Sequence, residues 1–214
     1  MRIAPEGRPF VLAGVVVLVA LVAVGWTLGG WGAALPLAWL PVALWIPAFF
    51  RDPERRGPRD PRLVIAPADG RVVSVGEVSE PDVIGGPALR ICIFMNVFNV
   101  HVNRHPVDGT VIRRDYRAGR FFNASLDKAS VHNEQATVAV QSARGPVVVR
   151  QIAGLVARRI VTDPAVGAVV RQGERLGLIR FGSRVDTCLP AAARPRVAVG
   201  DRTTAGVTVI AEWS

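Results

Sequence analysis

The sequence contains few residues of several reactive types. Of its 26 basic residues only Lys128 is a lysine, and it has two cysteines and three histidines. A pyridoxal phosphate enzyme needs a lysine for its Schiff base, so only Lys128 could serve that cofactor. Cys92 and Cys188 lie in apolar runs without metal-ligand spacing, which predicts reduced core residues of a cytoplasmic domain. With no histidine paired to a cysteine, we expect no zinc or other metal site.

Charge is missing from the N-terminal part of the chain. No charged residue lies between Arg8 and Arg51. Because one membrane helix needs about 20 apolar residues, this stretch suits two spans. We predict a helical hairpin within residues 1–50, with helices over 9–28 and 33–50 and a turn at 29–32. A cleaved secretory signal would have a much shorter apolar core.

Basic residues flank this hairpin on both sides and raise the net charge of the chain to +9. Arg2 and Arg8 precede it, and an arginine cluster follows it from Arg51. The positive-inside rule therefore predicts a protein of the cell (inner) membrane, with the rest of the chain on the cytoplasmic side. Anionic lipid headgroups suit the charge, whereas nucleic acid does not, because the chain has no basic helix or basic-aromatic motif.

After the hairpin the composition becomes that of a β-protein. Residues 51–62, "RDPERRGPRDPR", predict a charged linker, and a domain follows over 63–214. Alternating, β-branched runs predict a mainly β fold, a sandwich or partly closed barrel. We expect strands within 70–78, 88–95, 109–119, 136–143, 146–154 and 196–213, and helix only near 125–130 and 163–168.

Three places in the domain could carry chemistry. Asp69 stands in "APADGRVV", His101 and His105 flank "VNR", and Ser183 follows Gly182. A carboxylate, an imidazole and a hydroxyl together can activate a nucleophile. The G-x-S-x-G elbow of ordinary serine hydrolases is missing. A serine directly after a glycine could attack the unhindered preceding carbonyl, although Gly-Ser and Asp-Gly are also common turn pairs.

Four segments, in this order behind a membrane segment, carry a family resemblance. They are "FFRDPERRGPRDPRLVIAPADGRVVSV", "FMNVFNVHVNRHPVDGTV", "NASLDKASVHNEQ" and "RFGSRVDTCLP". Together they resemble phosphatidylserine decarboxylase proenzymes of the short prokaryotic form, over about residues 49–211.

The resemblance implies a zymogen of a pyruvoyl-dependent carboxy-lyase. Such a proenzyme cuts itself between Gly182 and Ser183, which gives a β chain of residues 1–182 and an α chain of 183–214. Ser183 becomes a covalent pyruvoyl group, which replaces pyridoxal phosphate and requires no metal. Its Schiff base with phosphatidylserine releases CO2 and leaves phosphatidylethanolamine. By similarity, Asp69 and a histidine activate Ser183.

The family pattern has two histidines three residues apart before the proline. Anchored on Pro106, His101 occupies the first position and Arg104 the second, while His105 is offset by one. We therefore expect His101 to be catalytic, with His105 as a possible substitute.

Other residues are expected on the substrate side. Arg104 could pair with the lipid phosphodiester, since a guanidinium offers two parallel donors. The loop "AGRFFNASLDKAS" resembles the family's substrate-side loop, so Phe121, Phe122 and Asn123 are expected to contact lipid. Arg184 stands where the family usually has threonine, which reflects either another substrate contact or the subfamily.

The resemblance also implies a homodimer. Two alternatives stay open at this point. One is a decarboxylase of a related serine phospholipid, such as the ether-linked archaetidylserine. The other is a non-catalytic, membrane-tethered β module that binds lipid headgroups and would keep its chain intact.

Overall fold

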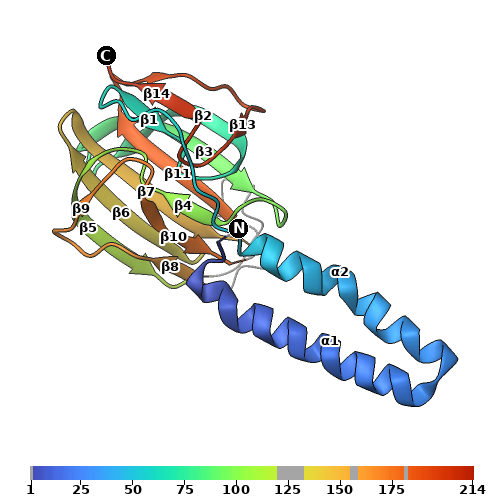
Figure 1. The fold of residues 1–214 in the computed structure, drawn as a ribbon. Helices are drawn as coiled ribbons and strands as arrows, with labels where there is room; N and C mark the ends of the chain where they lie inside the picture. Colours follow the sequence, from blue (N-terminus) through green and yellow to red (C-terminus); the bar gives the residue numbers. More distant parts are fainter. Residues whose placement is uncertain (1, 120–132, 155–158, 181–182) are drawn as a thin grey trace. The chain divides into compact units, whose positions relative to one another are not determined.

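The computed structural model describes residues 2–119, 133–154, 159–180 and 183–214. The chain divides into two compact units, Met1–Pro53 and Glu54–Ser214. The described part of the first is helical, and that of the second is built from β-strands and loops (Figure 1).

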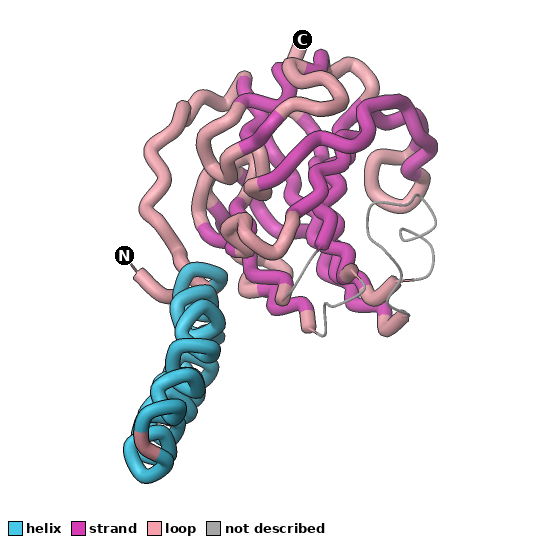
Figure 2. The backbone as a smooth tube through the Cα atoms, turned by 90° about the vertical axis from the view of Figure 1, so that its right-hand side faces the viewer, coloured by secondary structure: helices cyan, strands magenta, loops and turns pink. Residues whose placement is uncertain are grey.

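The helical unit is a hairpin of two long helices, α1 (Arg8–Leu28) and α2 (Ala34–Phe49), which lie side by side in Figures 1 and 2. At its tip, a Cβ on Gly25 would lie 2.4 Å from the carbonyl oxygen of Gly32, so only glycine permits this approach. The hairpin expected from the sequence is confirmed. Two short 3₁₀ helices complete the unit, η1 (Pro5–Gly7) before α1 and η2 (Gly30–Ala33) between the long helices.

Both arms of the hairpin are apolar on all sides. Leu12 and Leu37 are each 66% exposed within the chain. An 18-residue window within Pro5–Leu28 has a mean hydropathy of 2.6, and one within Gly30–Phe49 has a mean hydropathy of 1.6. Each stretch is long and apolar enough to cross a membrane, which suggests that the protein is membrane-associated.

The β unit is built on a curled, antiparallel eight-stranded sheet (Figure 1). Its inner strands are long and β-branched, which suits a pleated surface buried by packing. Strand β11 lies between β3 and β7 near the middle of the sheet. In order across the sheet the strands are β13 (Arg202–Thr203), β2 (Gly70–Glu80), β3 (Gly86–Met95), β11 (Ser183–Pro190), β7 (Gly145–Ala153), β6 (Gln135–Ser142), β5 (Gly109–Arg117) and β9 (Val169–Val170).

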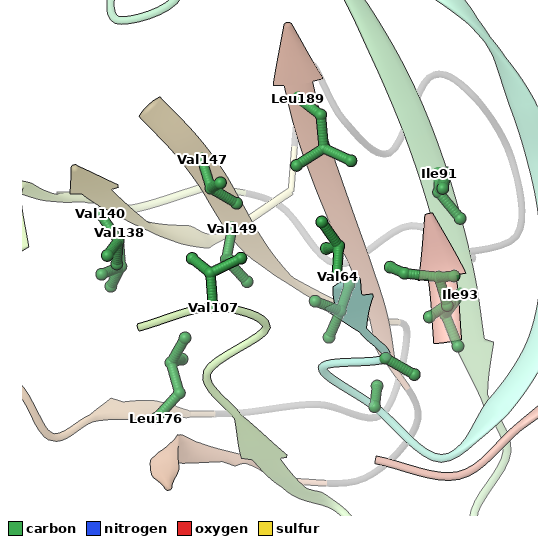
Figure 3. Close-up of a cluster of buried hydrophobic side chains, with 14 of the residues drawn as sticks. Val64, Ile91, Ile93, Val107, Val138, Val140, Val147, Val149, Leu176 and Leu189 are labelled. Atoms are coloured by element: carbon green, nitrogen blue, oxygen red, sulfur yellow. The ribbon is translucent and has the colours of Figure 1, made fainter. Parts of the chain in front are cut away.

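Two small sheets share the main hydrophobic core with this large sheet. Figure 3 shows side chains of the core that come from β1, β3, β6, β7, β10 and β11, among them Val64, Ile93 and Leu176. The predicted mainly β, partly closed architecture is confirmed. One small sheet has the order β1 (Leu63–Ile65), β14 (Val209–Glu212), β12 (Arg194–Pro195), and the other β4 (Val102–Arg104), β10 (Arg175–Ile179), β8 (Ile160–Thr162).

Strand β11 is buried on both faces. Val185 and Leu189 point into the main core, whereas Arg184, Asp186 and Cys188 alternate to the opposite face. There Arg184 Nε donates to Asp186 Oδ1 at 2.7 Å and Arg184 Nη2 to Asp186 Oδ2 at 3.0 Å. A buried charge pair thus starts one residue after the proposed cleavage site.

Both cysteines are free and buried, as expected. Burial is the main cause that raises the pKa of the Cys188 thiol to about 11, and it raises the pKa of Cys92 further. Both thiols are therefore protonated and weakly reactive at neutral pH.

Two expectations for secondary structure were wrong. Residues 163–168 form a turn with Gly167 at φ +88°, not a helix, because Pro164 and the left-handed glycine favour a turn. Residues 196–213 are not one strand but the short strands β13 and β14, separated by a turn in which Gly206 has φ +74°. The helix expected near 125–130 lies outside the described residues.

Candidate active site

Ser183 is the first residue of β11. Its main chain is in register with Met95 of β3 on one side and Ala153 of β7 on the other. The side chain is fully buried, and its Oγ donates a hydrogen bond to Met95 Sδ at 3.3 Å. The hydroxyl is therefore shielded from water and positioned from both neighbouring strands. Gly182, the other half of the expected cleavage step, lies outside the described residues.

His101 lies just before β4 and is also fully buried. Its Nδ1 is 3.0 Å from the carbonyl oxygen of Asn99. Since a carbonyl oxygen only accepts, Nδ1 carries the proton, and the neutral ring has its lone pair on Nε2. The carbonyl oxygen of His101 accepts a 3.4 Å hydrogen bond from the main-chain N–H of Ile179, four residues before Ser183. His101 thus has the tautomer that a general base requires.

Asp69 ends the loop before β2. Its Oδ2 accepts from Arg55 Nη2 at 2.7 Å, and its Oδ1 accepts from the main-chain N–H of Ala205 at 2.8 Å. Both carboxylate oxygens are therefore fixed. Arg55 was not among the expected site residues, because it comes from the segment that reads as a charged linker.

Hydrogen-bond register brings Asp69, His101 and Ser183 to one edge of the β unit. Two main-chain bonds, Ile65 N to Pro106 O and Arg104 N to Pro67 O, run residues 65–67 antiparallel to residues 104–106. These bonds join the segment that leads to Asp69 to the segment that follows His101. Asp69 and Ser183 also flank the end of β3, since Arg71 and Arg184 both pair with Phe94. Two strand spacings separate their main chains by about 10 Å.

A chain of buried polar side chains ends beside the serine. Thr162 Oγ1 donates to Gln151 Oε1 at 2.9 Å, and Gln151 Nε2 donates to Asn103 Oδ1 at 2.8 Å. Asn103 Nδ2 in turn lies 3.6 Å from Met95 Sδ, the acceptor of the Ser183 hydroxyl. Satisfied buried networks of this kind rigidify a core. Sequence reasoning missed it, although a glutamine inside "PVVVRQIAG" was a signal.

His105 lies at the other end of β4, four residues from His101. Its main chain exchanges hydrogen bonds with the Gly173–Glu174 turn, and the side chain is fully buried. Neither ring nitrogen has a hydrogen-bond partner among the described residues. Burial lowers the pKa of His105 to about 4, against a smaller opposing effect of Glu174. The imidazole is therefore neutral near pH 7 and is displaced along the strand from the Ser183 edge.

The expected substrate-side residues are only partly described. Arg104 Nη1 donates to the carbonyl oxygen of Gly173 at 3.1 Å, beside a 460 Å³ pocket that Arg59 and Arg171 also line. Arg184 is buried in its pair with Asp186, on the face of β11 opposite the main core. Phe121, Phe122 and Asn123 lie outside the described residues.

Comparisons with known proteins cover nearly the whole chain. The family model described as Phosphatidylserine decarboxylase matches residues 42–211. A phosphatidylserine decarboxylase proenzyme of Cupriavidus pinatubonensis is 50% identical over 98% of this chain and 94% of its own length. The proenzyme of Cupriavidus metallidurans has the same identity and coverage, and that of Aromatoleum aromaticum is 47% identical over 98% of this chain and 95% of its own.

Proposed function

Because the chain belongs to the phosphatidylserine decarboxylase family, whose members are pyruvoyl-dependent carboxy-lyases, we propose that it is a proenzyme that activates itself at Gly182-Ser183. The mature enzyme then converts phosphatidylserine to phosphatidylethanolamine and CO2. The observation that carries the proposal is the buried Ser183 hydroxyl, held at the same edge of the β unit as His101 and Asp69.

Self-cleavage starts with the Ser183 hydroxyl. Nε2 of His101 takes the hydroxyl proton, and Oγ attacks the carbonyl carbon of Gly182, so that an ester replaces the peptide bond. Asp69 supplies a fixed negative charge that favours the protonated imidazole. Elimination then breaks the ester, and the dehydroalanine left at position 183 hydrolyses to a pyruvoyl group and ammonia.

The surroundings of residue 183 fit the group that would be made from it. Hydrogen-bond ladders to β3 and β7 keep residue 183 in place after the chain is cut, and its burial excludes bulk water. When present, a pyruvoyl ketone draws off the electron pair released as CO2 departs. The place of His101 at the same edge supports a role in returning a proton to the substrate carbon.

The location follows from the hairpin and its arginines. Arg2 precedes α1, Arg8 is its first residue, and Arg51, Arg55 and Arg56 follow α2. By the positive-inside rule, we place both flanks in the cytoplasm, so that the decarboxylase acts at the cytoplasmic face of the inner membrane.

We also infer a homodimer, by similarity to the family. Light scattering of the detergent-solubilised chain tests this inference.

Intact mass spectrometry of the full-length protein beside its Ser183→Ala variant tests the proposed function. We expect two wild-type chains, the smaller beginning with a pyruvoyl group in place of Ser183, and a single uncut variant chain. Decarboxylation of phosphatidylserine should accompany only the cut protein. A folded wild-type protein that stays in one piece would contradict the proposal and favour the lipid-binding module.

A further inference from the structure

A pocket of about 620 Å³ opens at the same edge of the β unit as Ser183. Its wall includes Gly70 and Phe94, which directly adjoin Asp69 and Met95 in the chain. The pocket therefore begins one residue away from two groups of the candidate active site. Its volume is that of an ordinary small-ligand site.

Two arginines lie side by side in the wall of this pocket. Arg71 of β2 is directly in register with Arg202 of β13, and both line the pocket. Like charges placed directly opposite in antiparallel strands repel and destabilise the sheet unless they are neutralised.

No carboxylate neutralises this pair in the part of the chain that the structure describes. The nearest acids in sequence are engaged elsewhere, since Asp69 binds Arg55 and Asp201 accepts from the main-chain N–H of Ala198 at 2.8 Å. Other arginines of the same unit do have acidic partners, for example Arg175 with Asp163 at 2.7 Å. Within the described residues, Arg71 and Arg202 thus remain available to an external anion.

The rim of the pocket is apolar on one side. Phe98 is 71% exposed there, on a turn fixed by side-chain oxygens. Asn99 Oδ1 accepts a hydrogen bond from the main-chain N–H of Asn96 at 2.9 Å, and Asn96 Oδ1 accepts one from the main-chain N–H of Phe98 at 2.9 Å. The same turn holds His101 through the carbonyl of Asn99. A ligand that is anionic at one end and apolar at the other suits these walls.

We propose that Arg71 and Arg202 bind the phosphodiester of the serine phospholipid substrate. The proposal rests on the proposed function. Guanidinium groups match phosphate oxygens in a bidentate manner. The substrate carboxylate is the less suitable ligand, because a guanidinium on it would stabilise the ground state that must lose CO2.

The separation between Arg71 and Ser183 is compatible with one lipid molecule bound to both. Arg71 and Arg184 pair with opposite sides of Phe94, so about 10 Å separates their main chains. In a serine phospholipid, the phosphorus lies three covalent bonds from the carbon that loses CO2. Arg71 is the second residue of β2 and Ser183 the first of β11, so the lipid headgroup bridges them around the end of the sheet.

The test compares full-length Arg71→Gln/Arg202→Gln with wild type in mixed micelles of detergent and phosphatidylserine. We expect complete self-cleavage by intact mass, nearly unchanged kcat and an apparent KM raised about 10- to 100-fold, as for the loss of charge-assisted hydrogen bonds. Arg144→Gln is the matched control, since it removes one exposed arginine from the β6–β7 turn. An equal rise in KM for this control would show general surface attraction and overturn the site.

Soluble competitors identify the ligand. Glycerophosphoserine should inhibit wild type competitively and the double variant much more weakly. If inorganic phosphate binds at Arg71 and Arg202 without competing with phosphatidylserine, the site serves free phosphate and the proposal fails. Should the glutamine variant not fold, Arg71→Lys/Arg202→Lys keeps the charge but loses the planar fork, and a smaller KM increase is expected.

The two levels of failure are distinguishable. A wild-type chain that neither cuts itself nor decarboxylates phosphatidylserine contradicts the proposed function, whatever the arginine variants do. An active wild type whose double variant keeps its KM contradicts only the phosphate site.

Discussion

Asp69 has two fixed carboxylate oxygens, and in the proposed self-cleavage its negative charge favours the protonated form of His101. We predict that Asp69→Asn slows self-cleavage by about 100-fold or more, because loss of the negative charge weakens proton transfer from Ser183 to His101. Gel analysis of newly synthesised protein over time measures the rate. Asp60→Asn is the matched control, because Asp60 pairs with Arg62 in an exposed contact. Cleavage of both variants at the wild-type rate would remove Asp69 from the mechanism.

The lowered pKa of His105 predicts how the free energy of unfolding depends on pH. Its pKa is about 4 in the fold, because burial disfavours the charged ring, and about 6.5 in an unfolded chain. Between these values the unfolded chain binds more protons, so stability falls as the pH drops from about 6.5 to about 4, by up to roughly 3 kcal/mol. We expect His105→Leu to reduce this loss. Thermal unfolding in detergent at neutral and acidic pH provides the measurement, and parallel curves for both proteins would contradict it.

At the scale of an element, β11 combines reactivity with a buried ion pair. Arg184 and Asp186 are at most 1% exposed. We predict that Asp186→Asn destabilises the fold by about 3–5 kcal/mol, since it leaves a buried guanidinium without its counter-charge, and that Arg184→Met/Asp186→Leu recovers much of this loss. Thermal or denaturant unfolding tests both.

An exposed ion pair provides the comparison for the buried ion pair of β11. Arg196 is 59% exposed in its pair with Glu212, so Arg196→Met should cost less than about 1 kcal/mol. If it costs as much as Asp186→Asn, burial is not the reason for the effect at β11.

At the scale of the whole molecule, the proposed orientation can be tested by labelling. The natural thiols are buried with raised pKa values, so they leave a low background. Trp31, in η2 at the tip of the hairpin, is 94% exposed, and Ser214 is exposed at the C-terminus. We predict that an impermeant maleimide labels Trp31→Cys in intact cells, but Ser214→Cys only after lysis. The opposite pattern would contradict a cytoplasmic catalytic domain.

The sequence by itself determined the elements that have strong local signals. The uncharged stretch between Arg8 and Arg51 predicts the hairpin, because a membrane span is recognised by length and polarity alone. Alternating β-branched runs predict β2, β3, β5, β6 and β7, since a strand buried by packing repeats every two residues. The ordered motifs around Asp69, His101 and Ser183 identify the family.

Only the tertiary structure decided which residues lie beside one another. The sequence offers His101 and His105 as near neighbours, but strand pairing holds His101 against Ile179 and His105 against the Gly173–Glu174 turn. The sequence leaves open whether Arg184 marks a substrate contact or only the subfamily, and the alternation of β11 buries it against Asp186. The placement of Arg71 beside Arg202 depends on pairing between segments far apart in the chain. Local patterns specify elements, whereas register, burial and charge pairing are set by packing between them.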